Sequence, residues 1–350
     1  MELEKISCLF LMDRRFFLSV KHFLTYNQQM QLLHQKNVLI SNPTFAKEIL
    51  STISYYNIIN GYKDIFETLR DEEDGIEKFY PSVTLENLHK VYLIDNSFNN
   101  LLFKYIIYIE TTLKTKISYN VAQKLGEKQS QYLDYNKYVN SPPLDRRQVI
   151  SKITDEWNNN KNNHAIQHYK DNHSFTPPWI AAKALFFGTT INWYKILPPE
   201  IKKNIAQDYF MLTNLQDTEG QKELLVVILN LLREYRNNMA HGSRTFLSNV
   251  SCELSKNLLL SSISPEILTE KEFKEGIGQK DLFAVILSIA LLINDPLLFE
   301  RYIFDLSAIT RSSNIEDNLS PKGDVYKTLN IPENFVERIN MIRFMKFSHQ

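Results

Sequence analysis

Apolar residues recur at spacings of three and four along most of the chain, which is the period of an amphipathic helix. The segment 41–66 follows this period: it opens with Ser41 and Asn42, two residue types that cap helix N-termini, and meets a turn signal at Asn60-Gly61. No convincing run of alternating apolar and polar positions predicts a set of strands. The chain is therefore expected to be mostly α-helical.

A second, longer helix is predicted from Thr84, its N-cap, to Leu125, which precedes a glycine stop signal. The acidic segment before this helix is expected to be loop up to Pro81. Two stretches that combine proline with polar residues, 138–147 and 171–179, indicate connectors between helices.

The stretch from Trp179 to Leu197 predicts two short helices broken at Gly188, with Thr189 or Thr190 capping the second. A further helix then leads through an apolar run into the sequence LLREYRNNMAHGSRTF, which spans 231–246. Two more helices are predicted, an apolar and buried one at 283–293 and a charged one at 333–345. The fold class is all-α.

The composition indicates the cellular compartment but does not identify a binding partner. Lys plus Arg and Asp plus Glu both number 40, so the net charge is zero and a nucleic-acid partner would need a local basic patch. Cys8 and Cys252 are far apart, which favours a reducing compartment. The N-terminus lacks a signal peptide, and the apolar run 283–293 is too short to span a bilayer. We therefore expect a cytoplasmic protein without a membrane partner.

Reactive chemistry gathers at the end of the helix that enters 231–246. Arg236 and His241 are five residues apart, so a regular helix would place them roughly 140° apart, and the backbone must loosen for both to reach one substrate. Gly242 follows His241 directly and is a suitable left-handed helix cap. A histidine at a helix C-terminus is favoured in its protonated form by the helix dipole.

This pair suits a phosphodiester. The Arg236 guanidinium would hold phosphate oxygens and stabilise transition-state charge, while His241 would move protons to or from a ribose hydroxyl. Asn237 or Asn238 would orient one of them or touch the ribose. The alternative is an arginine and a histidine that satisfy carbonyls at a helix end, and the spacing by itself does not decide between the two.

The stretch RNNMAH, followed by Arg244, resembles the Arg-(four residues)-His signature of the HEPN superfamily. The remaining segments resemble its Abi-like branch, abortive-infection proteins of the AbiD/AbiF kind, in the same order along about nine-tenths of the chain. The segments that carry this resemblance are LTYNQQMQLLHQKNVLI, ISYYNIINGYKDIF, YIIYIETTLKTKISYNVAQKLG, PPWIAAKALFFGTT, NLLREYRNNMAHGSRTF and IPENFVERI.

The resemblance implies a toxin-like, metal-independent endoribonuclease that halts growth of an infected bacterial cell. It implies a composite site built by two chains, and it carries over Arg236 and His241, with Asn237 behind them. A repressing RNA or protein antitoxin is expected, because such a toxin must be held inactive in healthy cells. Because apolar periodicity runs through all three parts, we expect an N-terminal helical segment 1–84, a HEPN-like helical core 85–255 and a C-terminal helical segment 256–350 packed on that core.

The residues also favour two chains on chemical grounds. No credible set of metal ligands is visible, so nothing would activate a water, and attack by the RNA's own 2′-hydroxyl needs a proton acceptor and a proton donor. One His241 cannot hold both protonation states at once, whereas two copies related by a two-fold axis can. We therefore predict a homodimer that needs no cofactor.

The long helix predicted from Thr84 to Leu125 carries further residues that would assist Arg236 and His241. Glu110 would orient the arginine or histidine of the site, or would instead pair with Lys114 four residues later. A basic stripe that begins at Lys114 would follow an RNA backbone, although a solvated helix face explains it equally well. The residues predicted to bind RNA are Lys114, Lys116, Lys124, Arg233 and Arg244.

Two alternatives accompany this interpretation. His164, His168 and His173 look like a metal cluster, but no Cys or fixed carboxylate completes it, so no metal site is predicted. The alternative function is a non-catalytic helical scaffold of the same fold that binds RNA or protein.

Overall fold

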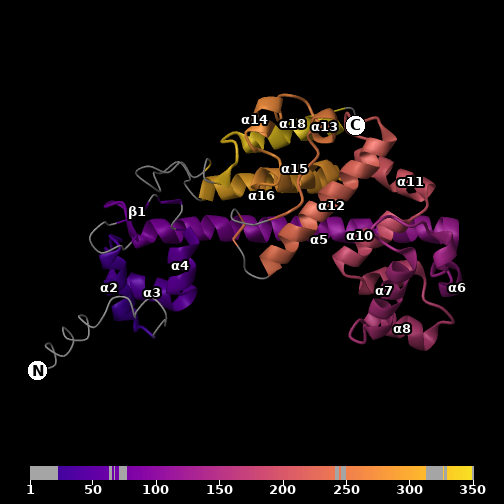
Figure 1. The fold of residues 1–350 in the computed structure, drawn as a ribbon, viewed down its shortest axis with the longest axis horizontal. Coiled ribbons are helices and arrows are strands. Elements are labelled where there is room, and N and C mark those ends of the chain that lie inside the picture. Colours follow the sequence, from indigo (N-terminus) through magenta and orange to yellow (C-terminus); the bar gives the residue numbers. More distant parts are fainter. Residues whose placement is uncertain are drawn as a thin grey trace, which may run out of the picture. The chain divides into compact units, whose positions relative to one another are not determined.

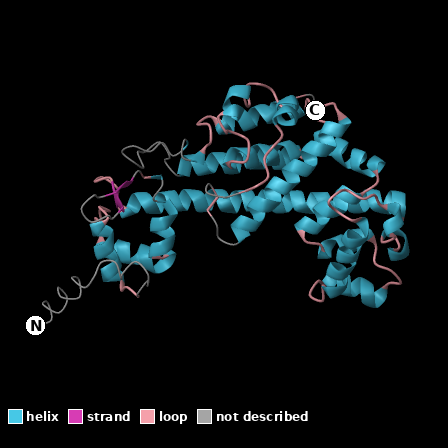
Figure 2. Cartoon of the chain, viewed as in Figure 1, coloured by secondary structure: helices cyan, strands magenta, loops and turns pink. Residues whose placement is uncertain are grey.

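The computed structural model describes residues 23–62, 65–66, 68–70, 77–240, 244–245, 250–312, 326 and 329–348. Helices dominate these residues, which confirms the all-α class (Figures 1 and 2). The chain divides into two compact units, one of residues 1–92 with 320–323 and one of residues 93–319 with 324–350.

Three short helices open the first unit: α2 (Tyr26–Gln35), α3 (Pro43–Ile53) and α4 (Tyr55–Tyr62). Asn42 caps α3, as the sequence predicts, by accepting a hydrogen bond from the Phe45 amide at 3.1 Å. The prediction of one helix from Ser41 to the turn signal at Asn60-Gly61 is wrong, because Ser54 adopts φ 70° and separates α3 from α4. Helix α4 also continues through the turn signal at Asn60-Gly61 to Tyr62.

A small hairpin corrects the predicted loop before Pro81. Strands β1 (Thr68–Arg70) and β2 (Glu77–Phe79) pair antiparallel, with Thr68 opposite Phe79. The Thr68 hydroxyl also donates to the Glu77 carboxylate at 2.9 Å. Strands of three residues are too short for an alternating pattern to stand out in the sequence, so only the cross-strand pairing reveals them.

The long helix α5 (Leu85–Leu125) confirms the prediction at both ends. The Thr84 hydroxyl accepts from the Asn87 amide at 3.0 Å, and the Asn87 side chain accepts in return from the Thr84 amide at 3.1 Å. Gly126 then takes φ +110°, a left-handed conformation that glycine adopts without strain. Within the second unit, α5 buries an apolar stripe that comprises Leu102, Tyr105, Ile106, Ile109, Leu113, Ile117 and Val121.

The rest of the second unit is a series of shorter helices. In chain order these are α6 (Gln129–Tyr132), η2 (Tyr135–Lys137), α7 (Arg146–Asn159), α8 (His164–Asn172), α9 (Pro178–Ala181), η3 (Ala182–Ala184), α10 (Phe187–Ile196), α11 (Pro199–Phe210), α12 (Thr218–Ala240), α13 (Lys256–Ser262), α14 (Glu270–Lys274), α15 (Leu282–Leu292), α16 (Pro296–Ser312) and α18 (Phe335–Phe347). Helix α12 packs against α10, α11 and α15. The connectors predicted around 138–147 and 171–179 fall mainly between helices.

The break predicted at Gly188 lies elsewhere. Gly188 is inside α10, and the chain leaves helical geometry at Leu185 and Phe186 instead. The Glu156 carboxylate on α7 accepts from the Phe186 amide at 2.9 Å and from the Thr189 hydroxyl at 2.6 Å. The Glu156 side chain, 30 residues away in sequence, thus caps the N-terminus of α10. The sequence predicts Thr189 or Thr190 in that role.

Helix α15 confirms the predicted buried apolar helix, since every one of its residues is buried. Asp281 caps its N-terminus, and its C-terminal carbonyls accept from the buried Lys346 amine of α18, the shortest bond being 2.6 Å to Ile293. Burial lowers the pKa of this amine to about 7. Among the described helices, none combines the length and apolarity needed to cross a membrane.

Candidate functional site

Helix α12 carries the predicted catalytic arginine. The Asp217 carboxylate opens it by accepting from the amides of Glu219 and Gly220 at 3.2 and 2.8 Å. Its apolar face is then buried continuously, at Leu224, Leu225, Ile228, Leu229, Leu231, Leu232, Tyr235 and Met239. This burial fixes the helix orientation and leaves the polar residues of its last turns on the opposite face.

Arg236 lies in the last turn of α12 with its side chain half-buried. The guanidinium carbon is 6.0 Å from the centre of the Phe103 ring on α5, and one terminal nitrogen is 3.5 Å from the Asn237 side-chain oxygen. Its Nε is buried without a hydrogen-bond partner. No carboxylate among the described residues forms an ion pair with Arg236. Its donors are therefore available for an anion such as a phosphate.

His241, the predicted partner of Arg236, lies outside the described residues, as does the predicted cap Gly242. Helix α12 is described as far as Ala240, and His241 is the next residue in the sequence. Asn237 is exposed and Asn238 half-buried. The relation between Arg236 and His241 stays a prediction from the sequence.

Glu110 forms an ion pair with Lys114, which is one of the two roles predicted for it. Its Oε1 lies 2.7 Å from the Lys114 amine, and the residue is only 8% exposed. Its other oxygen, Oε2, is buried without a hydrogen-bond partner. Phe103, Glu110 and Lys114 are spaced at seven and four, so they share one face of α5. Phe103 lies near Arg236, and two turns further along the same face of α5 lies Glu110, whose Oε2 can still accept a hydrogen bond.

Two of the lysines predicted to bind RNA, Lys116 and Lys124, are paired with acidic residues of α11. The Lys116 amine lies 3.2 Å from Asp208, and the Lys124 amine lies 2.7 Å from Glu200. Lys116 also lies 5.1 Å above the ring of Tyr209. An RNA phosphate would have to displace these carboxylates before it could use either lysine.

Two acidic residues that the sequence reasoning missed anchor the segment after α12. Glu234 accepts from the Ser251 amide at 2.6 Å and from the Ser251 hydroxyl at 2.8 Å, and these bonds keep the pKa of its carboxyl low despite partial burial. The buried Asp95 of α5 accepts from the Thr245 amide at 3.0 Å. An acidic residue on the apolar side of a helix is the signal that would have pointed to Asp95. Arg244, also predicted to bind RNA, is half-buried beside this anchor.

Two of the three histidines, His168 and His173, form an aromatic cluster with Tyr169. The rings of Tyr169 and His173 stack with centroids 4.3 Å apart, and His168 meets His173 edge-on at 5.5 Å. Within the described part of the chain, no group of three or more His, Cys, Asp or Glu residues is placed to hold a metal ion.

The fold and this site define an all-α protein with a half-buried arginine, unpaired with any described carboxylate, at the end of a long core helix. The chain belongs to the Abi-like protein family, whose profile matches residues 48–247, a segment that includes α5 and α12. A comparison with curated proteins finds no match. No solved structure matches the chain either.

Proposed function

We propose that the protein is a metal-independent endoribonuclease of the HEPN superfamily, of the AbiD/AbiF kind, that acts in abortive infection. The observation that supports this most directly is the state of Arg236. Its guanidinium is held near Phe103 at the end of α12 with no described carboxylate to neutralise it. An arginine held in this way is suited to neutralise a phosphate during transfer. Membership of the Abi-like family suggests the setting of defence by abortive infection.

The proposed reaction is attack by an RNA 2′-hydroxyl on its own 3′-phosphate. A neutral His241 takes the proton from the 2′-hydroxyl as the new oxygen–phosphorus bond forms. A protonated histidine gives a proton to the departing 5′-oxygen as the old bond breaks. Arg236 stabilises the extra negative charge on the phosphate between these events. The products are a 2′,3′-cyclic phosphate, or its opened form, and a 5′-hydroxyl end.

Two chains are proposed to complete the site, because one histidine cannot be acid and base at the same moment. A two-fold pairing of the α12 ends would supply His241 and Arg236 twice. Asn237, Asn238 and the unused oxygen of Glu110 are proposed to orient these groups. We further propose that the protein acts in the cytoplasm, and that a repressing RNA or protein holds it inactive in healthy cells.

The decisive experiment compares the purified wild-type protein with Arg236→Ala and His241→Ala on RNA in excess chelator, with the product ends mapped. Wild type is expected to leave cyclic phosphate ends, and both variants are expected to lose cleavage and toxicity. Arg147→Ala is the matched control. Its guanidinium is also close to an aromatic ring, 4.9 Å from Tyr135, but Arg147 is exposed at the start of α7.

The oligomer is tested separately by mixing an excess of His241→Ala chains into wild type. Mixed dimers should then depress cleavage below the level expected from dilution. Cleavage that chelator abolishes, or full activity from a strict monomer, would contradict this mechanism. Toxicity retained by both variants would instead favour the non-catalytic scaffold.

A further inference from the structure

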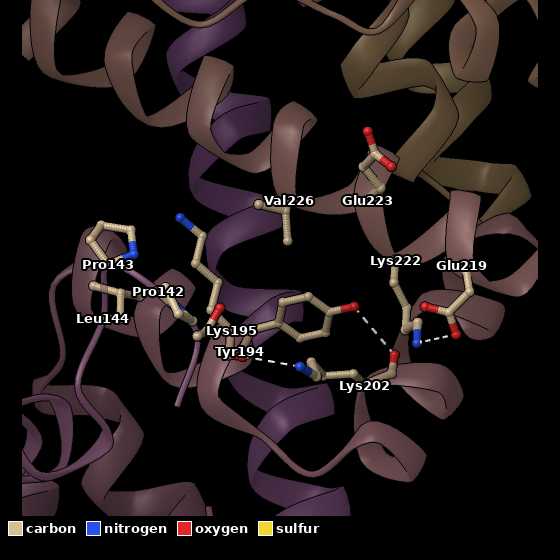
Figure 3. A pocket seen from close by; sticks show the side chains of 11 residues that line it. Pro142, Pro143, Leu144, Tyr194, Lys195, Lys202, Glu219, Lys222, Glu223 and Val226 are labelled. Carbon is tan, nitrogen blue, oxygen red and sulfur yellow. Dashed lines mark hydrogen bonds and ion pairs between the residues drawn. The ribbon is translucent and has the colours of Figure 1, made fainter. Parts of the chain in front are cut away.

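A second candidate site lies in the same unit, on the face of α12 that α10 and α11 approach. It is a cavity of about 450 Å³ between α10, the start of α11, the first turns of α12 and the loop at 141–144 (Figure 3). This volume falls within the range of small-molecule sites. None of the residues assigned above to RNA cleavage lines it.

Three lysines line the cavity against two glutamates, namely Lys195, Lys202 and Lys222 against Glu219 and Glu223. Lys222 is neutralised by Glu219 at 2.5 Å, and Lys202 donates to the Lys195 carbonyl at 3.2 Å. No carboxylate among the described residues pairs with Lys195. Figure 3 shows its side chain extending between Pro143 and Val226, away from the amines of Lys202 and Lys222.

Arg233 does not line the cavity itself, but it adds a second positive charge beyond Val226, near Lys195. Gly188 and Lys195 are seven residues apart and therefore share a face of α10. A side chain placed at Gly188 would meet Arg233 Cδ at 3.5 Å and its terminal nitrogen at 3.9 Å, so Arg233 lies along this same face. Burial and the neighbouring Arg233 both lower the pKa of the Lys195 amine. Two like charges close together favour a bound anion, which would compete at Arg233 with the neighbouring Glu234 carboxylate.

Part of the cavity lining is apolar and flanks the Lys195 side chain. It consists of Pro142, Pro143, Leu144 and Val226, with the ring of Tyr194 beside them. The Tyr194 hydroxyl is engaged with the Lys202 carbonyl at 3.3 Å, which holds the ring in place. A ligand that fits has an anionic group at one end and a flat, weakly polar body at the other.

We propose that this cavity binds a nucleotide through its phosphomonoester, with the phosphate between Lys195 and Arg233 and the base against Pro142–Leu144. Guanidinium and ammonium together suit a phosphate dianion, because the arginine offers a fork of donors and the lysine a compact charge. The proline-rich wall and Tyr194 accept the face of a base. This binding does not require RNA cleavage, and Lys195 distinguishes it from the proposed RNA site, because Arg233 is also among the residues predicted to bind RNA.

The test is calorimetric titration of the full-length protein with AMP, and with adenosine as the probe that lacks the phosphate. AMP should bind saturably and at least about tenfold more tightly than adenosine, since charge-assisted bonds to phosphate are stronger than neutral ones. Lys195→Gln and Arg233→Gln should each weaken AMP binding by about tenfold. Lys203→Gln is the matched control, because Lys203 is exposed on α11 and does not line the cavity.

A free nucleotide and the 5′ end of an RNA present the same phosphate. A 5′-phosphorylated ribotetranucleotide is therefore compared with its 5′-hydroxyl counterpart. Tighter binding of AMP than of the phosphorylated tetranucleotide assigns the site to free nucleotides, and the reverse order assigns it to RNA ends. Equal binding of AMP and adenosine overturns the proposal. So does an AMP affinity that Lys195→Gln leaves unchanged, or that Lys203→Gln weakens as much.

Discussion

The cations of α5 and those of the last turns of α12 differ in what already neutralises them. On α5, Lys114, Lys116 and Lys124 lie 2.7, 3.2 and 2.7 Å from carboxylates. On α12, Arg233 and Arg236 have no ion pair with a carboxylate of the described residues. The sequence shows both helices as basic, but of these five cations only Arg233 and Arg236 can meet a phosphate without first breaking an ion pair with a described carboxylate.

The largest expected difference between the two helices is in catalysis. Arg236→Ala should lower RNA cleavage by about 10²–10³-fold, the usual cost of removing one donor that stabilises transition-state charge. Lys116→Ala should change the rate by no more than about fivefold, because an exposed ion pair contributes only roughly 0.2–1 kcal/mol. Single-turnover cleavage rates measure both. Equal losses in the two variants would remove the distinction between α5 and α12.

The second prediction concerns the free energy of unfolding. Glu110→Ala should lower it by about 2–4 kcal/mol, because the mostly buried Lys114 amine would lose its partner. Urea denaturation of wild type and variant gives this difference. Glu110→Gln keeps the volume and separates packing from charge. An unchanged unfolding free energy would contradict a stabilising ion pair at Glu110, and a loss of cleavage in the same variant would then leave only its proposed orienting role.

A smaller effect is expected when the α5 lysines are released. The double variant Glu200→Gln and Asp208→Asn should raise RNA affinity at low salt. It should steepen the plot of log affinity against log salt by about 0.7 for each lysine that gains a phosphate of single-stranded RNA. Filter binding over a range of salt concentrations measures this slope. A slope equal to that of wild type would show that Lys116 and Lys124 do not face the RNA.

The smallest effect is expected at the exposed end of α5. Lys124→Met should lower the free energy of unfolding by less than about 1 kcal/mol, since Lys124 and Glu200 are both well solvated. The same urea titration used for Glu110 measures it. A loss as large as that of Glu110→Ala would show that the pair with α11 holds the unit together.

Helix starts and stops were well predicted where the deciding atoms lie within a few residues. Asn42 and Thr84 cap helices through amides three residues later, and Gly126 ends α5 through its own backbone. The predictions were wrong where the deciding atoms lie further away in sequence or where the residue type gives no signal. Ser54 takes a left-handed conformation that its residue type does not announce, and the β1–β2 hairpin depends on cross-strand pairing.

The candidate site shows the same limit. Its arginine and its position at the end of α12 follow from the local sequence. The pairing of Lys116 with Asp208 joins residues 92 apart in sequence, and that of Lys124 with Glu200 joins residues 76 apart. No periodicity within α5 indicates either partner, so the charge left for a ligand could not be read from the stripe itself.

The sequence by itself determined the all-α class, the caps of the long helices and the placing of Arg236 in the last turn of α12, because helical period and capping act over three or four residues. The tertiary structure alone decided which polar groups remain unused. Glu156 of α7 caps α10, Lys346 closes α15, and acidic residues of α11 neutralise α5. Ion pairs and buried hydrogen bonds need atoms within about 4 Å, and only packing brings distant segments that close.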